Sequence, residues 1–330
     1  MIVFWNPFLD PSLVFMVLLF FLIPLIFTLL VMPYIIRKLK ENGHIVKDMY
    51  KLETPSVPTN GGLVILLVSI FSLSILSLFY AKHISTINYS IIVVVVLFAF
   101  FGILDDMINI GRPAKLILLY YCSYPLIPFI LTTTVTLPVF GEINCAAIYP
   151  QIIITTYVPV VANLVNMHSG LNGLAPGLSL IVLTTLILKT LFFGDISNAL
   201  YVVCLTGAVA GYFWFEKYPS RIFWGNIGAL SVGAGMGALI VTQGFIISGF
   251  IMLIPHVINF LLYIYWRMNH QKYPTQKFGR VDKEGILVVP NPLTLKWVLP
   301  YYTRMTEKEG SLAMFGVTAI FCAIGFYIPG

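Results

Sequence analysis

Charged side chains are scarce in this sequence. Asp, Glu, Lys and Arg together make up 10% of the 330 residues, whereas 59% of the residues are hydrophobic. The mean hydropathy is +0.93. Such a chain has too little polar surface to cover a water-soluble globule, which argues against a soluble enzyme or binding domain. The lack of charge therefore predicts an integral membrane protein.

Cysteine is also rare, and several common sequence signals are missing. The four cysteines, Cys122, Cys145, Cys204 and Cys322, have neither paired nor metal-like spacing, so we interpret them as packing residues. We find no sequence repeat, low-complexity tract or coiled-coil heptad. The opening MIVFWNPFLDPS has no basic residue before its apolar stretch and no small-residue cleavage site, so we expect a retained terminus rather than a signal peptide.

Apolar runs recur along the whole chain, each close to the roughly 20 residues that a helix needs to cross a bilayer. Ten spans are predicted, near residues 11–34, 61–80, 88–104, 116–133, 150–165, 176–193, 198–215, 229–242, 245–266 and 310–328. With the amino terminus outside, one side of the membrane carries the loops 35–60, 105–115, 163–175, 216–228 and 267–309. Of the 19 Lys and Arg residues, all but Lys82 and Lys189 fall in these loops, so we place the loops in the cytoplasm.

The predicted fold class is an all-α integral membrane protein of about ten transmembrane helices, with both termini outside and the functional loops on the cytoplasmic side. We expect one polytopic domain over residues 1–330, with residues 267–309 as a cytoplasmic loop insertion. We attribute the net charge of +6 to basic inner loops that face anionic lipid, not to a nucleic-acid partner. The oligomeric state is open, with a homodimer as one alternative.

Two local patterns predict packing and a turn. Gly233, Gly235 and Gly237 in the eighth span predict close approach of a neighbouring backbone rather than a nucleotide fingerprint. The stretch RVDKEGILVV, residues 280–289, predicts a short hairpin that turns at DKEG.

The third span ends in two adjacent carboxylates, Asp105 and Asp106, directly after the run VVVVLFAFFGIL. On a helix end these side chains point about 100° apart. Two aspartates at the end of a span can simply be solvated. The pair becomes informative through the other polar groups at the same membrane face.

A polar loop follows the fifth span, with the sequence NLVNMHSGLNGL over residues 163–174. Asn166 and Asn172 supply oxygen acceptors and amide donors without charge, while Gly170 and Gly173 allow a ligand to approach backbone N–H groups. The plainer alternative is an Asn- and Gly-rich turn. His168 alone would more often be structural than catalytic.

Two further clusters lie at the same face. The stretch PSRIFWGNIG, residues 219–228, places a cation, two aromatic rings and an amide at a helix start, where free N–H groups favour anions. Read alone, it is an interface anchor. Basic residues also gather in the loops 35–60 and 267–309, where they usually set the topology. They are Lys47, Lys51, Lys272, Lys277 and Arg280.

Together the clusters place carboxylates, amide oxygens, basic groups and glycine backbone at one depth of one membrane face. Mg²⁺ prefers hard oxygen ligands and typically combines one or two carboxylates with substrate phosphates and water. The mixture therefore suits a diphosphate held by Mg²⁺, with Mn²⁺ as an alternative cofactor.

In their order and spacing the motifs resemble those of the polyprenyl-phosphate N-acetylhexosamine-1-phosphate transferases, ten-span enzymes that make the first lipid-linked sugar diphosphate of glycan pathways. The motifs are PTNGGL, FGILDDMIN with a lysine nine residues after its second Asp, NLVNMHSGLNGL and PSRIFWGN, and the resemblance covers nearly the whole chain. Asn-Gly in the third motif, and a long loop without a His-rich motif, are similar to the dolichyl-phosphate branch, in an archaeal form, rather than to the cell-wall branch. The resemblance implies transfer of N-acetylglucosamine-1-phosphate from UDP-N-acetylglucosamine to a polyprenyl phosphate, with release of UMP, in a cell membrane or, in a eukaryote, the endoplasmic reticulum membrane.

The resemblance also implies roles for individual residues. Asp105 and Asp106 match the family's aspartate pair near the lipid phosphate and the metal, and Lys115 matches its phosphate-holding lysine. The expected metal ligands are Asp106, Asn166 and Asn226. Asn172 and Phe223 match the residues that recognise and stack on uracil. The expected substrate-binding residues in full are Asn172, Gly170, Phe223, Arg221, Lys277, Arg280 and Thr59.

Two positions depart from the family pattern. Asn226 stands where the family usually has a metal-binding Asp, and an amide oxygen can coordinate Mg²⁺ but adds no charge. Thr59 stands where the eukaryotic branch has an acid near the sugar, which leaves the sugar open. Two alternatives follow: a nucleotide-sugar-binding relative with weakened catalysis, or a secondary transporter that uses the intramembrane His256 and Asn259.

Overall fold

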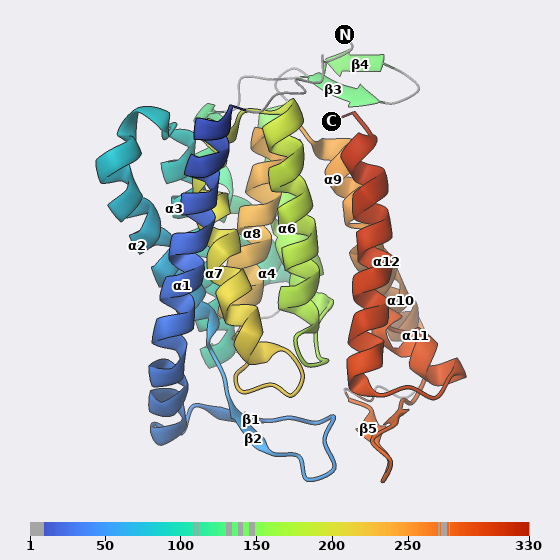
Figure 1. Ribbon diagram of the computed structural model, residues 1–330. Coiled ribbons are helices and arrows are strands. Elements are labelled where there is room, and N and C mark those ends of the chain that lie inside the picture. Colours follow the sequence, from blue (N-terminus) through green and yellow to red (C-terminus); the bar gives the residue numbers. More distant parts are fainter. Residues whose placement is uncertain are drawn as a thin grey trace.

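The computed structural model describes residues 10–108, 110, 112–129, 134–137, 141–144, 149–269, 271, 276 and 278–329, and it is predominantly helical (Figure 1). The α-helices are α1 Pro11–Glu41, α2 Gly62–Tyr80, α3 Ile87–Ile108, α4 Arg112–Cys122, α5 Thr155–Met167, α6 Leu174–Phe193, α7 Leu200–Glu216, α8 Gly225–Thr242, α9 Ile246–Met252, α10 Ile254–Met268, α11 Leu295–Tyr302 and α12 Glu307–Tyr327.

Antiparallel hairpins occupy three of the connections. They are β1 Ile45–Lys47 with β2 Ser56–Pro58, β3 Thr134–Leu137 with β4 Gly141–Asn144, and β5 Arg280–Val281 with β6 Leu287–Val288. Arg280 pairs with Val288, and the N–H of Gly285 donates to the carbonyl of Asp282 at 3.0 Å, so the predicted turn at DKEG is confirmed. In Figure 1 the strands β1, β2 and β5 lie at one end of the helices, and β3 and β4 lie at the other.

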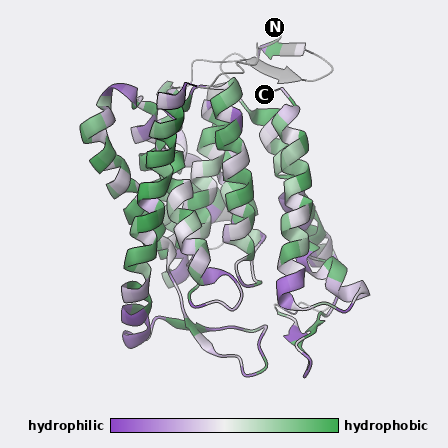
Figure 2. Cartoon of the chain, in the orientation of Figure 1, coloured by the Kyte–Doolittle hydropathy of each residue, from purple (hydrophilic) through white to green (hydrophobic). Residues whose placement is uncertain are grey.

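Helix length and composition identify a multi-pass membrane protein. Among the described residues, six helices are long and apolar enough to cross a bilayer: α1, α2 with its short 3₁₀ extension, α3, α6, α8 and α12. Figure 2 shows these helices as largely hydrophobic, with hydrophilic stretches gathered at the end that carries β1, β2 and β5.

The predicted ninth span is bent rather than straight. Helices α9 and α10 meet at an angle of 65°, at a break of one residue, Leu253. Pro255 follows the break in the first turn of α10, where its missing N–H costs no helical hydrogen bond. The sequence window 245–266 therefore contains two helices.

Helix α8 is the central helix, and its glycines allow the neighbouring backbones to approach. A Cβ on Gly233 would lie 2.6 Å from the Cα of Ala162, and one on Gly237 would lie 3.0 Å from the Cα of Val158. The predicted approach of a neighbouring backbone is confirmed at Gly233 and Gly237, whereas a Cβ on Gly235 would overlap the side chain of Leu205. The residue number rises by four along α8 where it falls by four along α5, so the two helices run antiparallel.

The amino-terminal end of α8 is enclosed by α2 and α3. A Cβ on Gly102 of α3 would lie 2.8 Å from the backbone of Ile227, and one on Gly62 of α2 would overlap the backbone of Gly228. Helices α2, α3 and α5 therefore all converge on the first turns of α8, at the same end as β1 and β2.

Lys189 is a buried cation inside α6, and its partners are backbone carbonyls. Its Nζ donates to the carbonyls of Phe326 at 2.9 Å and Ile328 at 2.7 Å, at the carboxyl end of α12. The last carbonyls of a helix lack intrahelical partners and carry partial negative charge. Lys189 therefore stabilises the end of α12 within the bundle.

Candidate functional site

The aspartate pair at the end of α3 meets the start of α8. The side-chain Nδ2 of Asn226 donates to Asp105 Oδ2 at 3.2 Å and to Asp106 Oδ1 at 2.7 Å. The two aspartates differ in environment, because the side chain of Asp105 is only 11% exposed whereas Asp106 is an exposed residue. The amide thus bridges one enclosed and one accessible carboxylate.

Lys115 of α4 completes this cluster. Its Nζ lies 2.9 Å from Asp105 Oδ2, and the lysine side chain is 14% exposed. The ammonium also lies 5.8 Å from the ring centroid of Phe101. Two carboxylates and one ammonium leave the cluster with a formal charge of −1, which favours a further cation.

The orientation of Asn226 bears on its expected role as a metal ligand. With Nδ2 facing both carboxylates, the amide oxygen Oδ1 points away from them, because the two atoms lie on opposite sides of a planar group. Which amide atom faces the carboxylates is assigned from the hydrogen bonds. A cation shared with Asp106 would require the amide to turn over.

Asn166 approaches the same region from α5. Gly237 of α8 faces Val158, and Gly233 faces Ala162. One more turn along both helices places Asn166, on the same face of α5 as Ala162, opposite the first turns of α8. Helices α3, α4 and α8 therefore bring together Asp105, Asp106, Lys115 and Asn226, and the end of α5 that carries Asn166 runs toward the first turns of α8.

The motif at the start of α2 pairs with the motif before α8 through its backbone. The N–H of Phe223 donates to the carbonyl of Pro58 at 2.9 Å, and the N–H of Gly61 donates to the carbonyl of Phe223 at 3.0 Å. Thr59 lies inside this pairing and is half-buried, and its N–H donates to the carbonyl of His44 at 3.0 Å. The Phe223 side chain is also half-buried, so part of its ring is accessible.

Glu216 supports this pairing and was not predicted from the sequence. Its Oε2 accepts from the N–H of Trp224 at 2.9 Å and from the hydroxyl of Tyr212 at 2.6 Å. The sequence signal that could have identified Glu216 is its position four residues after Tyr212 at the end of an apolar helix. The buried carboxylate fixes the backbone that carries Phe223.

Asn172 joins three other segments at the same end of the helices. Its Nδ2 donates to Asp48 Oδ2 at 3.1 Å, its Oδ1 accepts from the N–H of Ser220 at 2.9 Å, and its own N–H donates to Glu307 Oε1 at 2.6 Å. Lys51 pairs with Glu307, and its Nζ lies 3.3 Å from Asp48 Oδ2. The side-chain amide of Asn172 is therefore engaged at both ends.

Tyr50 ties the loop between α1 and α2 to the long loop 267–309. Its hydroxyl accepts from the indole N–H of Trp297 at 3.0 Å and from the N–H of Gly279 at 3.4 Å. Burial raises the pKa of Tyr50 to about 12, so the hydroxyl stays protonated. The contact holds the loop that carries Asp48 and Lys51 against the long loop.

Gly170 lies beside a lysine that the sequence did not single out. Gly170 is exposed with φ +107°, and a Cβ there would overlap Nζ of Lys296. Lys296, in the first turn of α11, donates to the carbonyl of Ser169. Glycine at this position therefore makes room for the ammonium.

The remaining predicted residues lie at the edge of the site. The guanidinium of Arg221 lies 4.6 Å from the ring centroid of Phe215 and donates to the carbonyl of Trp214 at 3.1 Å, near the end of α7. Arg280 is exposed and, with Lys51, lines a cavity of about 440 Å³ between the α1–α2 loop and the long loop. The predicted Lys277 lies outside the described residues.

His256 and Asn259, the residues of the transporter alternative, serve local contacts. Asn259 Nδ2 donates to the carbonyl of Met167 at 3.2 Å, and its Oδ1 accepts from the N–H of Leu295 at 2.9 Å. His256 packs edge-on against His168, with ring centroids 4.7 Å apart. These contacts join α10 to the loop after α5.

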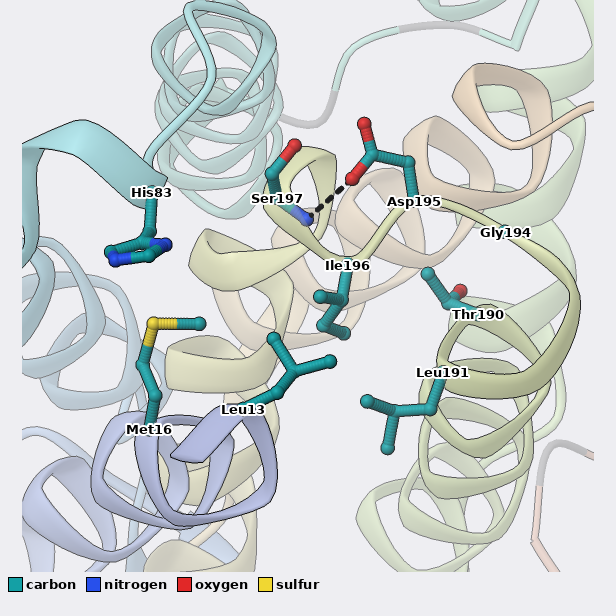
Figure 3. A pocket seen from close by; sticks show the side chains of 9 residues that line it. All are labelled: Leu13, Met16, His83, Thr190, Leu191, Gly194, Asp195, Ile196 and Ser197. Atoms are coloured by element: carbon teal, nitrogen blue, oxygen red, sulfur yellow. Dashed lines mark hydrogen bonds between the residues drawn. The ribbon is translucent and has the colours of Figure 1, made fainter. Parts of the chain in front are cut away.

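A second cavity, of about 390 Å³, lies between the beginning of α1 and the α6–α7 connection (Figure 3). Asp195 faces it while accepting the N–H of Ser197 at 2.9 Å, and His83 stands across from it. The cavity contains none of the predicted site residues.

The donor set of the aspartate cluster fits a hard divalent cation. Within the part of the chain that the structure describes, no three His, Cys, Asp or Glu side chains come together as a metal site. The cluster nevertheless offers the accessible carboxylate of Asp106, and the amide oxygen of Asn226 would join it once that side chain turns over. Mg²⁺ often takes only one or two carboxylates when phosphates complete its shell.

The chain is similar in sequence to known membrane transferases. Residues 87–244, which include the aspartate cluster, match the family model described as glycosyl transferase family 4. Two archaeal proteins bear the provisional name UDP-N-acetylglucosamine–dolichyl-phosphate N-acetylglucosaminephosphotransferase. The one from Saccharolobus solfataricus is 29% identical over 299 residues, which cover 88% of this chain and 90% of that protein. The one from Sulfolobus acidocaldarius is 27% identical over 317 residues, covering 93% and 94%.

A bacterial relative is similar over a shorter stretch. The phospho-N-acetylmuramoyl-pentapeptide-transferase of Clostridium perfringens is 29% identical over 241 residues, which cover 69% of this chain and 74% of that protein. The matches together confirm the predicted resemblance to this family of membrane transferases.

Proposed function

We propose that this protein transfers N-acetylglucosamine-1-phosphate from UDP-N-acetylglucosamine to a polyprenyl phosphate of the dolichyl type, with release of UMP. The observation that carries the proposal is the cluster of Asp105, Asp106, Lys115 and Asn226 at the hydrophilic end of apolar helices. A lipid-borne phosphate and a water-soluble nucleotide can meet at that depth. Similarity along 88% and 93% of the chain to proteins that bear the corresponding name supports the same reaction.

Mg²⁺, or Mn²⁺ in its place, suits the oxygen donors of this cluster. Asp106, Asn166 and Asn226 are the residues that would hold the cation, together with substrate phosphate and water. When bound, the cation would offset the negative charge of the diphosphate and of the departing phosphate.

The nucleophile in this reaction is the lipid phosphate. One of its oxygens forms a bond to the phosphorus that carries the sugar, and the bond from that phosphorus to the oxygen of UMP breaks. A phosphate monoester is largely ionised near pH 7, so no strong base is required. Asp105 orients Lys115, and the Lys115 ammonium would hold the attacking phosphate.

The nucleotide would lie between the loop after α5 and the segment before α8. Phe223 would stack on uracil beside Gly170, while Arg221, Lys277, Arg280 and Thr59 would surround the sugar and diphosphate. Recognition of uracil by the Asn172 side chain requires the base to replace a contact to Asp48 or Ser220, because both ends of that amide are engaged.

We further propose ten spans with both termini outside and one polytopic domain with a cytoplasmic insertion at 267–309. The count of ten is reached if each of three shorter apolar helices also spans the membrane, beside the six long helices and the bent pair. These shorter helices are Ala114–Phe129, Gln151–Met167 and Leu200–Glu216. The basic loops support a site on the cytoplasmic face of a cell membrane, or of the endoplasmic reticulum membrane in a eukaryote. The homodimer stays a prediction.

The test is UMP release by purified protein supplied with UDP-N-acetylglucosamine, a polyprenyl phosphate and Mg²⁺. We expect UMP that depends on the lipid and on the cation and that disappears in the Asp105→Asn variant. UDP-N-acetylglucosamine that binds without releasing UMP, across several polyprenyl phosphates, would overturn the transferase and leave a binding-only relative. Uptake into vesicles without UMP would favour the transporter.

A further inference from the structure

Lys296 of α11 is a cation that contacts the loop after α5 and has no acid paired with it among the described residues. Within the described part of the chain it forms no ion pair, and its Nζ donates to one backbone carbonyl, that of Ser169. Glu307, the acid that acts on it electrostatically, is already bound to Lys51 and to the N–H of Asn172. An ammonium has three N–H donors, so Lys296 has donors to spare for an anion.

Lys296 lies beside an exposed glycine on one side and close to neutral polar side chains on the other. The glycine is Gly170, whose missing side chain leaves the space that Nζ occupies. On the other side lie His168, with neither ring nitrogen hydrogen-bonded, and Thr294, whose hydroxyl also lacks a partner among the described residues. Burial, then His256 and Lys296, lower the pKa of His168 well below its usual value, so it is neutral and does not neutralise an anion on its own.

The loop also fixes where this ammonium lies relative to the aspartate cluster. The hydroxyl of Ser169 donates to the carbonyl of Asn166 at 2.9 Å, so the loop folds back onto the end of α5. Lys296 therefore meets the loop one turn away from Asn166, an expected metal ligand. Lys115 meets Asp105 on α3 instead, so the two lysines approach from different helices.

We propose that Lys296 is a substrate-binding residue whose ammonium contacts the diphosphate of the nucleotide sugar. The proposal rests on the function proposed above and adds a residue to it. The ligand chemistry is a phosphate oxyanion, which either the nucleotide or the lipid could supply. The nucleotide is favoured because Ser169 and Gly170, which touch Lys296, belong to the same loop as Asn172.

The experiment compares Lys296→Met and Lys296→Arg with Lys283→Met, which removes an exposed lysine from the turn of the same long loop. The KM values for UDP-N-acetylglucosamine and for the polyprenyl phosphate are measured by UMP release, and the binding of UDP and of uridine is measured without turnover. For Lys296→Met we expect about a 10- to 100-fold rise in the KM for UDP-N-acetylglucosamine and in the Kd for UDP, the size expected for a hydrogen bond to a charged group. Uridine binding and the KM for the lipid should stay at the wild-type value, Lys296→Arg should recover part of the loss, and Lys283→Met should change nothing.

Several outcomes would overturn the assignment. Equal weakening of UDP and uridine would show a structural role, a rise confined to the lipid KM would assign Lys296 to the lipid phosphate, and unchanged UDP affinity would remove it from the site. If Lys296→Met does not fold, Lys296→Arg is compared with the neutral Lys296→Gln. The ratio of UDP affinity to uridine affinity should be higher in Lys296→Arg, and equal ratios would overturn the assignment. UDP binding that depends on Lys296 in a protein that releases no UMP would reject the proposed transferase while retaining this inference.

Discussion

Replacing Asn226 with aspartate is the sharpest perturbation of the cluster. The change converts the one donor that bridges Asp105 and Asp106 into a third negative charge. If a new carboxylate oxygen takes the place of Nδ2, it lies 3.2 Å and 2.7 Å from the two existing carboxylate oxygens. Without a cation, Asn226→Asp therefore places like charges in contact.

Coulomb's law gives the size of the effect. At the dielectric constant of water the two new repulsions are about 1.3 and about 1.5 kcal/mol, or about 3 kcal/mol together. A bound divalent cation turns this repulsion into attraction. Relief of only half of the repulsion, about 1.4 kcal/mol, corresponds to about a tenfold gain in cation affinity.

The assay is thermal unfolding of the purified protein in EDTA and across a Mg²⁺ titration, with UMP release followed over the same titration. We expect Asn226→Asp to unfold at a lower temperature than wild type in EDTA, to regain stability with Mg²⁺, and to reach half-maximal activity at about a tenfold lower Mg²⁺ concentration. Asn198→Asp is the matched control, because Asn198 also donates to an aspartate, Asp195 at 3.1 Å, but outside the cluster. A Mg²⁺ dependence of Asn226→Asp that matches wild type would refute the reasoning and remove residue 226 from the metal site.

Three further predictions test the site and the fold. Lys115→Met should lower the kcat for UMP release by about 100- to 1000-fold, the usual effect of losing one charge-stabilising donor, with partial recovery in Lys115→Arg. Gly62→Ala should lower the free energy of unfolding by about 1–3 kcal/mol through overpacking, because its Cβ would overlap the Gly228 backbone. Gly316→Ala, which has open space inside α12, should instead raise it by about 0.5–1 kcal/mol in the same thermal unfolding assay. Burial lowers the pKa of Lys296 to about 8, against an opposing effect of Glu307. Between pH about 8 and the ordinary pKa of lysine, Lys296 is protonated in the unfolded state but not in the folded state. The free energy of unfolding should therefore rise with pH across this window. UDP affinity measured across the same window should fall in wild type, as the ammonium loses its proton, and stay level in Lys296→Arg.

Much of the architecture follows from local sequence patterns. Apolar runs predict where the spans lie, glycines in α8 predict close helix contacts, and the DKEG turn predicts the hairpin of β5 and β6, because each depends on residues close in the chain. The bend between α9 and α10 was missed, although Pro255 marks it, because a long apolar window does not distinguish one helix from two.

The contacts that organise the site depend on residues far apart in the sequence. Lys51 and Glu307 are 256 positions apart, and Asn172 is 135 positions from Glu307, so no spacing rule connects them. Residue type alone also leaves open which atom of Asn226 faces the aspartates. The sequence predicts which segments carry polar groups, whereas the tertiary structure decides which of those groups neutralise one another.

The difference between the two halves of the site has a consequence for its chemistry. Around Asn172, the acids Asp48 and Glu307 are matched by Lys51 and by backbone or amide N–H groups, so the charged groups of this half already have partners without a ligand. At Asp105 and Asp106 one ammonium and one amide face two carboxylates, and the Lys296 ammonium has no ion pair with any residue that the structure describes. A diphosphate with its cation carries both of the missing charges, since the cation complements the aspartates and the phosphate complements the lysine. The unmatched charges on either side of the loop after α5 are therefore the part of the protein that a nucleotide diphosphate would complete.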